Sequence, residues 1–393
     1  MPNRTAFHGP AAILWSIGLL LWLLATLEVY VYSSYMWTVP GEQESGCADL
    51  ISFWLIEVLA RGHADFFLCL ALGAWLGLAY ERTRVPFPEL LLPLCALAVV
   101  GLAQWVLVSP HSLLLAFALV GVVALYLIRV LPSHYLLPLA IALIALPLVF
   151  EWYWAIHLDA KGASYLRWWE NRRAEIHREM AAEMELLAHG DYADHLAHRW
   201  DQLIDAARYA HYWIPPQMGA LLIGYWLVVA GPLVAPRHHT GFFLRQIVLG
   251  LPLGLLLAGI AALLGHDEYT TRASYAYTLG QTAQAVAGPL LALGVLALVL
   301  AYGRGLRWLA PVGQMPFTNH LVQTAFWSTL LFGYGFGIGL GAMTPAYQFV
   351  FGVGFFVIQI VVSRAWLAVF AHGPVEWLWH AGSVWARAVT ERR

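Results

Sequence analysis

Four polar residues gather in one otherwise apolar stretch near residue 320, namely Thr318, Asn319, His320 and Gln323. In a helix, Asn319 and Gln323 would share one face because they are four residues apart, whereas His320 would point about 100° away. An acyl-transfer site needs a general base and hydrogen-bond donors, which a histidine and two amides can supply. Hydrogen bonding between membrane helices is the other common use of such side chains. The sequence leaves both interpretations open.

Other polar residues in apolar stretches stand alone, and each is a candidate because burying it in a membrane is costly. The uncharged ones are expected to pack between helices. They are Gln104, Gln217, Gln281, Gln284 and Gln359. Glu28 and Glu151 lie near the ends of their apolar stretches, where they can reach interfacial water. His63 and Asp65 lack further ligands at metal-binding spacing, so no metal site is expected.

The composition indicates a membrane protein. Hydrophobic residues make up 61% of the 393 residues and charged residues 11%, against roughly a quarter charged in an ordinary soluble domain. A soluble core could not enclose this much apolar surface. The net charge of -2 provides no basic surface for a phosphate backbone, so no nucleic-acid partner is expected.

The apolar stretches are long enough to be membrane spans. A spanning helix needs about 20 mostly apolar residues to cross roughly 30 Å of hydrocarbon. The sequence therefore predicts an all-α, polytopic membrane helix bundle with about ten transmembrane helices plus interfacial amphipathic helices. The predicted spans lie near residues 10–32, 64–81, 89–109, 112–131, 135–157, 214–235, 242–264, 275–302, 315–339 and 345–371. The segment 47–61 mixes apolar and charged residues, which is typical of a helix in the membrane interface.

The arginines orient the predicted bundle, because cytoplasmic loops retain basic residues. On the side shared by the two termini lie Arg4, Arg82, Arg84, Arg129, Arg237, Arg245, Arg304, Arg307, Arg387, Arg392 and Arg393. The short loops on the other side carry only Arg61 and Arg272. Ten spans with both termini in the cytoplasm account for this asymmetry.

One long hydrophilic connection, residues 158–213, separates the fifth and sixth predicted spans and holds seven basic and ten acidic residues. Its apolar positions recur at three- and four-residue steps, which predicts two amphipathic helices, 164–187 and 192–212. These helices are expected to lie along the outer membrane surface or to cap the bundle, either as solvated helices or as a lid over an intramembrane cavity. The chain thus divides into a membrane region 1–157, an extracytoplasmic insert 158–213 and a membrane region with a cytoplasmic tail, 214–393.

Four motifs occur in order near the carboxy terminus. They are Gly313-Gln-Met-Pro-Phe-Thr-Asn-His-Leu-Val-Gln323, Phe332-Gly-Tyr-Gly-Phe-Gly-Ile-Gly339, Ser363-Arg-Ala-Trp366 and Phe370-Ala-His-Gly-Pro-Val-Glu-Trp-Leu-Trp379. This set resembles the carboxy-terminal domain, of unknown function, of the YeiB-like bacterial membrane proteins. The resemblance extends at lower strength to residues 187–199, 70–74 and 114–121. It implies a multi-pass protein of the bacterial inner membrane.

YeiB-like proteins are grouped with a superfamily of transmembrane acyltransferases. The resemblance therefore implies transfer of an acyl group from cytoplasmic acyl-CoA, such as acetyl-CoA, to a lipid-like or glycan acceptor reached from the other face. The candidate substrate-binding residues are Thr318, Asn319, Gln323, Gln104, Gln314, Glu376 and Trp377.

The chain departs from the family pattern at residues that would do chemistry. The family's histidine in the third span falls on Gln104, which cannot act as a base, and an arginine before the ninth span becomes Gln314. The arginine after the Glu-Trp-Leu-Trp run becomes His380. A general base contributes about 10² to 10⁴-fold in rate, so its loss argues against ordinary acyltransferase activity. His320 and His111 are the candidate replacement bases.

Three functions remain. The favoured one is a diverged, non-catalytic or accessory protein whose intramembrane cavity binds a lipid-like or acylated ligand. The second is an active acyltransferase that uses His320 or His111 as base and acyl-CoA as donor. The third is a small-molecule transporter, since helices broken near Gly288 and Pro289 suit alternating access. The expected partners are membrane lipids and either a second copy of the chain or another membrane protein.

Overall fold

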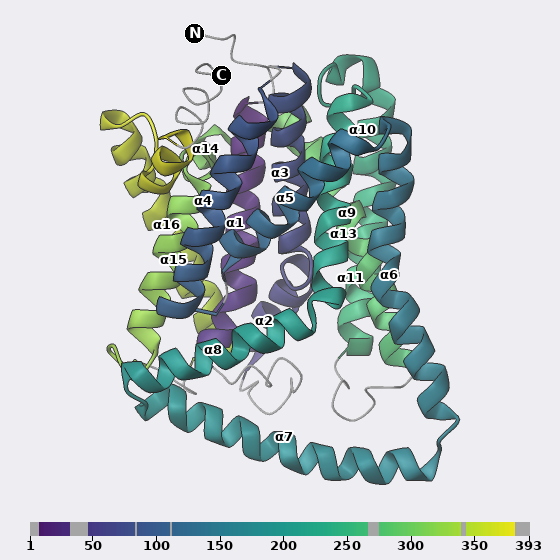
Figure 1. The fold of residues 1–393 in the computed structure, drawn as a ribbon, viewed down its shortest axis with the longest axis vertical. Coiled ribbons are helices and arrows are strands. Elements are labelled where there is room, and N and C mark those ends of the chain that lie inside the picture. The colour runs from purple at the N-terminus through teal and green to yellow at the C-terminus, as the bar shows by residue number, and fades with distance from the viewer. Residues whose placement is uncertain are drawn as a thin grey trace.

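The computed structural model describes residues 8–31, 46–82, 85–110, 112–265, 275–338 and 343–381. Within these ranges the regular structure is helical and no strand occurs. The predicted all-α fold is therefore confirmed. Its long helices run side by side as a bundle (Figure 1).

The larger helices of the described residues follow one another along the chain. They are α1 (His8–Val31), α2 (Cys47–Leu59), α3 (Ala64–Gly77), α4 (Phe87–Leu107), α5 (Leu113–Val130), α6 (Ser133–Asp159), α7 (Ala163–His189), α8 (Tyr192–Arg208), α9 (Ala210–Val229), α10 (Thr240–Arg245), α11 (Leu251–Gly265), α13 (Tyr275–Tyr302), α14 (Ala310–Gln314), α15 (Pro316–Leu331) and α16 (Pro345–Val369). Short π-helical turns extend α3 through Arg82 and join α10 to α11.

Seven helical segments of the described chain are long and apolar enough to cross a membrane. They are Gly9–Glu28, Phe87–Leu107, Leu113–Val130, Ser133–Leu158, Pro236–Leu264, Tyr275–Tyr302 and Pro345–Val369. Large apolar side chains lie on their outer faces, as Val361 and Val362 of α16 do with 64% and 57% exposure. Lipid accommodates such a surface, whereas water does not. The chain is therefore a multi-pass membrane protein.

The predicted spans near 64–81, 214–235 and 315–339 correspond to α3, α9 and α15, which do not reach the length and hydropathy of the other seven. α3 has 14 residues and α15 has 16. Most of their side chains are buried against other helices, so their sequences suit protein neighbours rather than lipid. The count of ten spans stays a prediction.

Glycines allow α3 and α9 to pack with their backbones in contact. A Cβ added at Gly73 would overlap the carbonyl oxygen of Leu221, and one added at Gly224 would overlap that of Leu70. Gly77, one turn further along α3, also faces α9. Small residues four positions apart are a common means of close association between membrane helices. This contact joins the regions before and after the predicted insert.

Two long helices cross one end of the bundle, at the bottom of Figure 1. α7 and α8 confirm the two predicted helices of the insert, and they meet at Gly190. Asp191 and Asp194 form a reciprocal capping box that begins α8. α8 ends at Arg208 rather than near residue 212, because the chain turns at Tyr209 into α9.

The segment 47–61 forms the short helix α2, as predicted. Phe53 and Ile56 are buried on one side, while Leu50, Ile51 and Leu55 are exposed. This two-sided apolar character suits an interfacial helix, and its place in the interface stays a prediction. The end of the bundle opposite α7 holds the start of α1 and a short helix at 374–381 (Figure 1). That this end is cytoplasmic also stays a prediction.

Candidate functional site

The polar residues of α15 face three different neighbours, and His320 faces α4 and α5. Its side chain is fully buried. The Leu113 backbone N–H donates to His320 Nε2 over 3.2 Å, and Gln104 Nε2 lies 3.1 Å from the same atom. An imidazole nitrogen that accepts a hydrogen bond must be unprotonated, and its lone pair is occupied. The candidate base is therefore part of a buried hydrogen-bond network between helices.

Gln104 connects His320 to two hydroxyl groups. Its Nε2 donates to Thr324 Oγ1 over 2.8 Å, and its Oε1 accepts a hydrogen bond from Ser112 Oγ over 3.0 Å. Ser112 is also the N-cap residue of α5. The network thus fixes the end of α4, the start of α5 and the middle of α15 relative to one another.

His320→Ala should destabilise the protein by about 2–4 kcal/mol, because it removes the acceptor of the buried Leu113 N–H and opens a cavity beside Trp22. The Gln104 amide loses one of its partners and keeps Thr324. The rings of Trp22 and His320 are 6.0 Å apart. Thermal unfolding of the purified protein in detergent measures the loss. His320→Gln, which retains an acceptor, should recover part of it. A wild-type unfolding midpoint for His320→Ala would contradict this role.

Asn319 and Gln323 face α16 from one side of α15, as their spacing predicted. Asn319 Nδ2 donates to Ser363 Oγ over 3.0 Å, and Gln323 Nε2 donates to Gln359 Oε1 over 2.8 Å. Gln359 in turn donates to the Asn319 carbonyl oxygen over 3.0 Å. These amides form hydrogen bonds between helices, which are the second use that the sequence left open.

Thr318 faces the segment that follows α16. The Glu376 carboxylate accepts from the backbone N–H groups of Phe317 and Thr318 over 2.7 and 3.1 Å, and from the Thr318 hydroxyl over 2.5 Å. The first turn of a helix has free N–H donors and a positive dipole end, so Glu376 caps α15. Burial raises the pKa of Glu376, and these hydrogen bonds partly oppose that change.

The candidate residues therefore form three separate contacts rather than one cluster. The structure pairs His320 with Gln104, Asn319 with Gln323 through Gln359, and Thr318 with Glu376. Gln314 and Trp377 are exposed at the same end of the bundle as Glu376. His111 lies outside the described residues.

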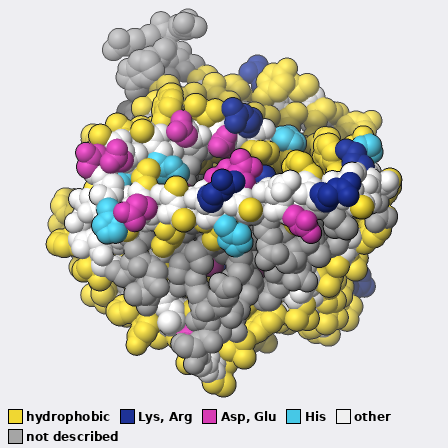
Figure 2. Space-filling view, turned by 90° about the horizontal axis from the view of Figure 1, so that it is seen from below, with side chains coloured by type: hydrophobic (Ala, Val, Ile, Leu, Met, Phe, Trp, Pro, Cys, Tyr) yellow, Lys and Arg dark blue, Asp and Glu magenta, His cyan; other side chains and the backbone are white. Residues whose placement is uncertain are grey.

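A cavity of about 1060 Å³ lies at the end of the bundle that α7 crosses. Its lining comes from the start of α3, from α6 and α7, from the α8–α9 junction and from α13. Eight aromatic residues form much of its wall: Phe66, Trp154, Tyr165, Trp168, Trp169, Tyr209, Tyr212 and Tyr277. Figure 2 views this end, where charged side chains follow a band across the molecule and the surface is hollowed beside it.

A few polar groups interrupt the aromatic wall. Lys161, the single lysine of the chain, and Arg172 lie on the α7 side, Glu151 on α6, and Gln281 and Gln284 on α13. The Arg172 guanidinium forms ion pairs with Glu175 over 2.9 Å and with Glu179 over 3.0 Å, and both carboxylates raise its pKa. Apolar walls with a few polar groups are the usual lining of small-molecule sites. Glu151, Gln281 and Gln284 were predicted only as isolated polar residues. Of the candidates for catalysis and substrate binding, those that the structure describes do not line this cavity.

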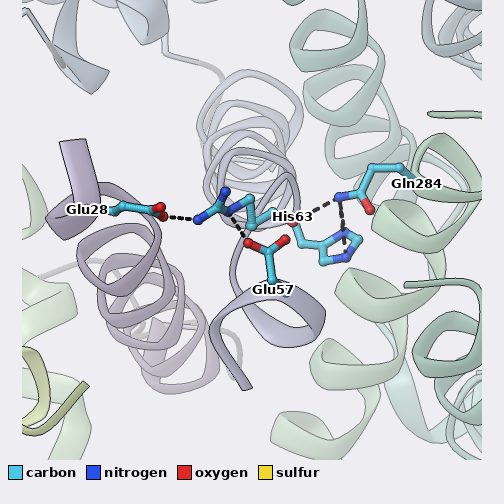
Figure 3. Close-up of polar contacts among 5 residues, drawn as sticks. Glu28, Glu57, His63 and Gln284 are labelled. Atoms are coloured by element: carbon cyan, nitrogen blue, oxygen red, sulfur yellow. Dashed lines mark hydrogen bonds and ion pairs between the residues drawn. The ribbon is translucent and has the colours of Figure 1, made fainter. Parts of the chain in front are cut away.

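A polar network joins the helices behind the inner wall (Figure 3). Arg61 forms ion pairs with Glu28 of α1 and Glu57 of α2. The Arg61 carbonyl accepts a hydrogen bond from Gln284 Nε2 over 2.9 Å, and the same Nε2 lies 3.3 Å from His63 Nδ1. The network therefore links α1, α2 and the start of α3 to the cavity-lining helix α13.

Gly62 permits the approach of α13 to this network. Its φ of 71° is in the left-handed region that favours glycine. A Cβ at this position would overlap Gln284 Nε2. Any larger residue would therefore separate the Arg61 carbonyl from Gln284 as well as strain the backbone.

Arg199 holds α8 against the ends of two other helices. It is 2% exposed, and its guanidinium donates to the Leu107 carbonyl over 3.0 Å and to the Tyr334 hydroxyl over 2.9 Å. His195, one turn earlier, packs against the Tyr334 ring at 4.7 Å. Burial lowers the pKa of His195 to about 4, and the Arg199 charge adds to the effect. The buried positive charge of this contact is therefore that of Arg199.

The region that contains α15 and α16 is similar to known proteins. Residues 227–386 match the family described as Protein of unknown function (DUF418). The chain is 38% identical over 72 residues to the uncharacterized protein YxaH of Bacillus subtilis (strain 168), which covers 18% of each chain. It is 29% identical over 172 residues to the uncharacterized protein YeiB of Escherichia coli (strain K12), which covers 41% of this chain and 42% of that one. The chain thus carries a DUF418 region and is similar to the YeiB-like proteins.

The matches span less than half the length of either curated relative. No solved structure matches the chain. The predicted YeiB-like resemblance is thus confirmed, with a DUF418 region that includes α15, α16 and Glu376. Much of the cavity wall, from α6, α7 and the start of α9, precedes this DUF418 region.

The sequence treated Glu28, Gln217 and Gln284 as isolated residues, whereas each has a partner from another part of the chain. It also did not predict which aromatic residues line the cavity of this YeiB-like protein. The available signal was the density of Trp and Tyr in residues 152–169 and 209–213. Helical spacing alone does not show which of these rings face inward, because that depends on where α7 crosses the bundle.

Proposed function

We propose that this protein, located in the bacterial inner membrane with both termini in the cytoplasm, binds a lipid-like or acylated amphiphile in the cavity beneath α7. The proposal rests on the combination of aromatic and polar side chains in the cavity wall. Aromatic rings provide apolar surface for an acyl chain, while Lys161, Gln281 and Glu151 provide polar contacts for a head group. The volume of about 1060 Å³ is at the upper end of the usual range for ligand sites, roughly 300–1,000 Å³.

Binding without acyl transfer is favoured by the surroundings of the candidate base His320. Its Nε2 already accepts a backbone hydrogen bond, and the described residues that line the cavity include no histidine. The membrane itself is the nearest source of an amphiphile. On this proposal the DUF418 region contributes one cavity wall through α13, and α7 covers the ligand from the extracytoplasmic side.

Two neighbouring positions on α13 provide a matched test. Ala285 lines the cavity, whereas Val286 is 46% exposed on the outer surface. Ala285→Trp should place an indole ring in the cavity and reduce binding roughly tenfold, equivalent to about 1.4 kcal/mol. Val286→Trp should leave binding unchanged.

The probe is a long-chain fatty acid with a photoreactive diazirine, added to the purified full-length protein in detergent micelles. After irradiation, mass spectrometry quantifies the label on α7 peptides, because α7 crosses the bundle end and lines the cavity. Equal labelling of α7 in the wild type and Ala285→Trp would overturn the proposal. Loss of labelling in Ala285→Trp alone would support it.

A further inference from the structure

Two buried oxygen atoms near the cavity have no hydrogen-bond donor among the described residues. Gln217 of α9 donates from Nε2 to Asp65 Oδ2 of α3 over 3.2 Å. The remaining oxygens of this pair, Asp65 Oδ1 and Gln217 Oε1, are both buried and have no hydrogen-bond partner in the part of the chain that the structure describes. Gln217 is 9% exposed. Two buried acceptors without a donor, on side chains that already share a hydrogen bond, are unfavourable in an apolar interior.

The charge of an ionised Asp65 would also be uncompensated. The ion pairs of the described residues do not include Asp65. The nearest arginine or lysine along the chain, Arg61, is engaged by Glu28 and Glu57. A carboxylate among membrane helices is costly unless a positive charge accompanies it.

We propose that Asp65 and Gln217 form a binding site for one small positive charge, either a proton or a sodium-like monovalent cation. A proton on Asp65 Oδ1 would turn this acceptor into a donor to Gln217 Oε1, so both orphaned atoms would be satisfied by one reciprocal acid–amide pair. A cation would instead be held by the same carboxylate and amide oxygens, which are the ligands that hard cations prefer.

The site lies beside the cavity but does not depend on an amphiphile. Phe66 and Pro216, the chain neighbours of Asp65 and Gln217, line the cavity wall. Other titratable groups on the surrounding elements include His63 and Cys69 near Asp65, His211 and Tyr212 on α9, Glu151 on α6 and Tyr277 on α13. This inference goes beyond the proposed function, because it rests on α3 and α9 and its test uses no fatty-acid probe.

Asp65→Asn provides the central variant. Its amide has the size of the carboxyl group and can donate to Gln217 Oε1, so it imitates the occupied site without a charge. Asp201→Asn is the matched control, because Asp201 is an exposed acid on α8. Gln217→Met serves as a second variant that removes the amide and keeps the carboxyl group.

The purified full-length proteins are compared at pH 7 in sodium chloride and in choline chloride of equal ionic strength. If a cation occupies the site, sodium raises the unfolding midpoint of the wild type and of Asp201→Asn in a saturable manner, and this response is absent from Asp65→Asn. If a proton occupies it, sodium has no effect, but infrared difference spectra show a protonated carboxyl band that Asp65→Asn lacks and Gln217→Met shifts to higher frequency. An ionised Asp65 with no sodium response would overturn the proposal.

Discussion

Gly73→Val is expected to give no folded protein, because α3 and α9 leave no room for a side chain at this position. Even the Cβ of Gly73→Ala would overlap the Leu221 carbonyl oxygen, which belongs to a helix backbone and cannot rotate away. In an isolated helix alanine is favoured over glycine by about 1 kcal/mol, so propensity acts in the opposite direction. We expect a loss of roughly 3 kcal/mol for Gly73→Ala, at the upper end for overpacking, and a larger one for valine.

Gly354→Val on α16 is the matched control. It makes the same change in a membrane helix, at a glycine whose added Cβ would meet no atom within 4 Å. The yield of monodisperse protein in mild detergent and the unfolding midpoint measure both variants. Folded Gly73→Val with a wild-type midpoint would show that α3 and α9 do not pack this closely.

Arg199→Ala is expected to destabilise the contact of α8 with the bundle by about 3–5 kcal/mol. The change removes the donor to the Tyr334 hydroxyl and one of two donors to the Leu107 carbonyl, which keeps the Tyr192 hydroxyl. It also removes a guanidinium that lies 5.1 Å from the Tyr334 ring centre. Removal of a buried charge recovers some desolvation energy, but the lost hydrogen bonds to a charged group outweigh it. The loss should be local, so that α8 opens while the spans stay folded.

Hydrogen exchange of residues 192–208 and limited proteolysis near Gly190 measure this opening. Arg208→Ala is the control on the same helix, because Arg208 is 70% exposed and pairs with Asp205 at the surface. We expect it to change stability by at most about 0.5 kcal/mol. Equal exchange rates in Arg199→Ala and the wild type would show that Arg199 does not hold α8 in place.

The contacts of α15 and the cavity beneath α7 are two separate parts of the molecule, which the sequence did not distinguish. The polar residues of α15, which carry much of the YeiB-like signature, are used for hydrogen bonds to α4, α5, α16 and Glu376. The cavity lies under α7 and has an aromatic wall. The polar residues of the DUF418 region therefore form hydrogen bonds that hold helices together. The proposed binding surface comes largely from residues that precede this region.

The sequence by itself determined the class of protein, the positions of most helices and the division of the insert into α7 and α8. These features depend on local properties, namely the length of apolar stretches, helical periodicity and the break at Gly190. Apolar length also identified the seven helices that can meet lipid. It did not set α3, α9 and α15 apart as interior helices, because burial by protein and burial by lipid favour similar side chains.

Only the tertiary structure decided which polar residues meet. Gln104 and His320 are 216 positions apart, and Asp65 and Gln217 are 152 apart. Helical spacing shows which residues share a face, but the partner of that face depends on how distant helices cross. For α3 and α9 this crossing is set by the absence of side chains at Gly73 and Gly224, and it places the Asp65–Gln217 pair beside the cavity.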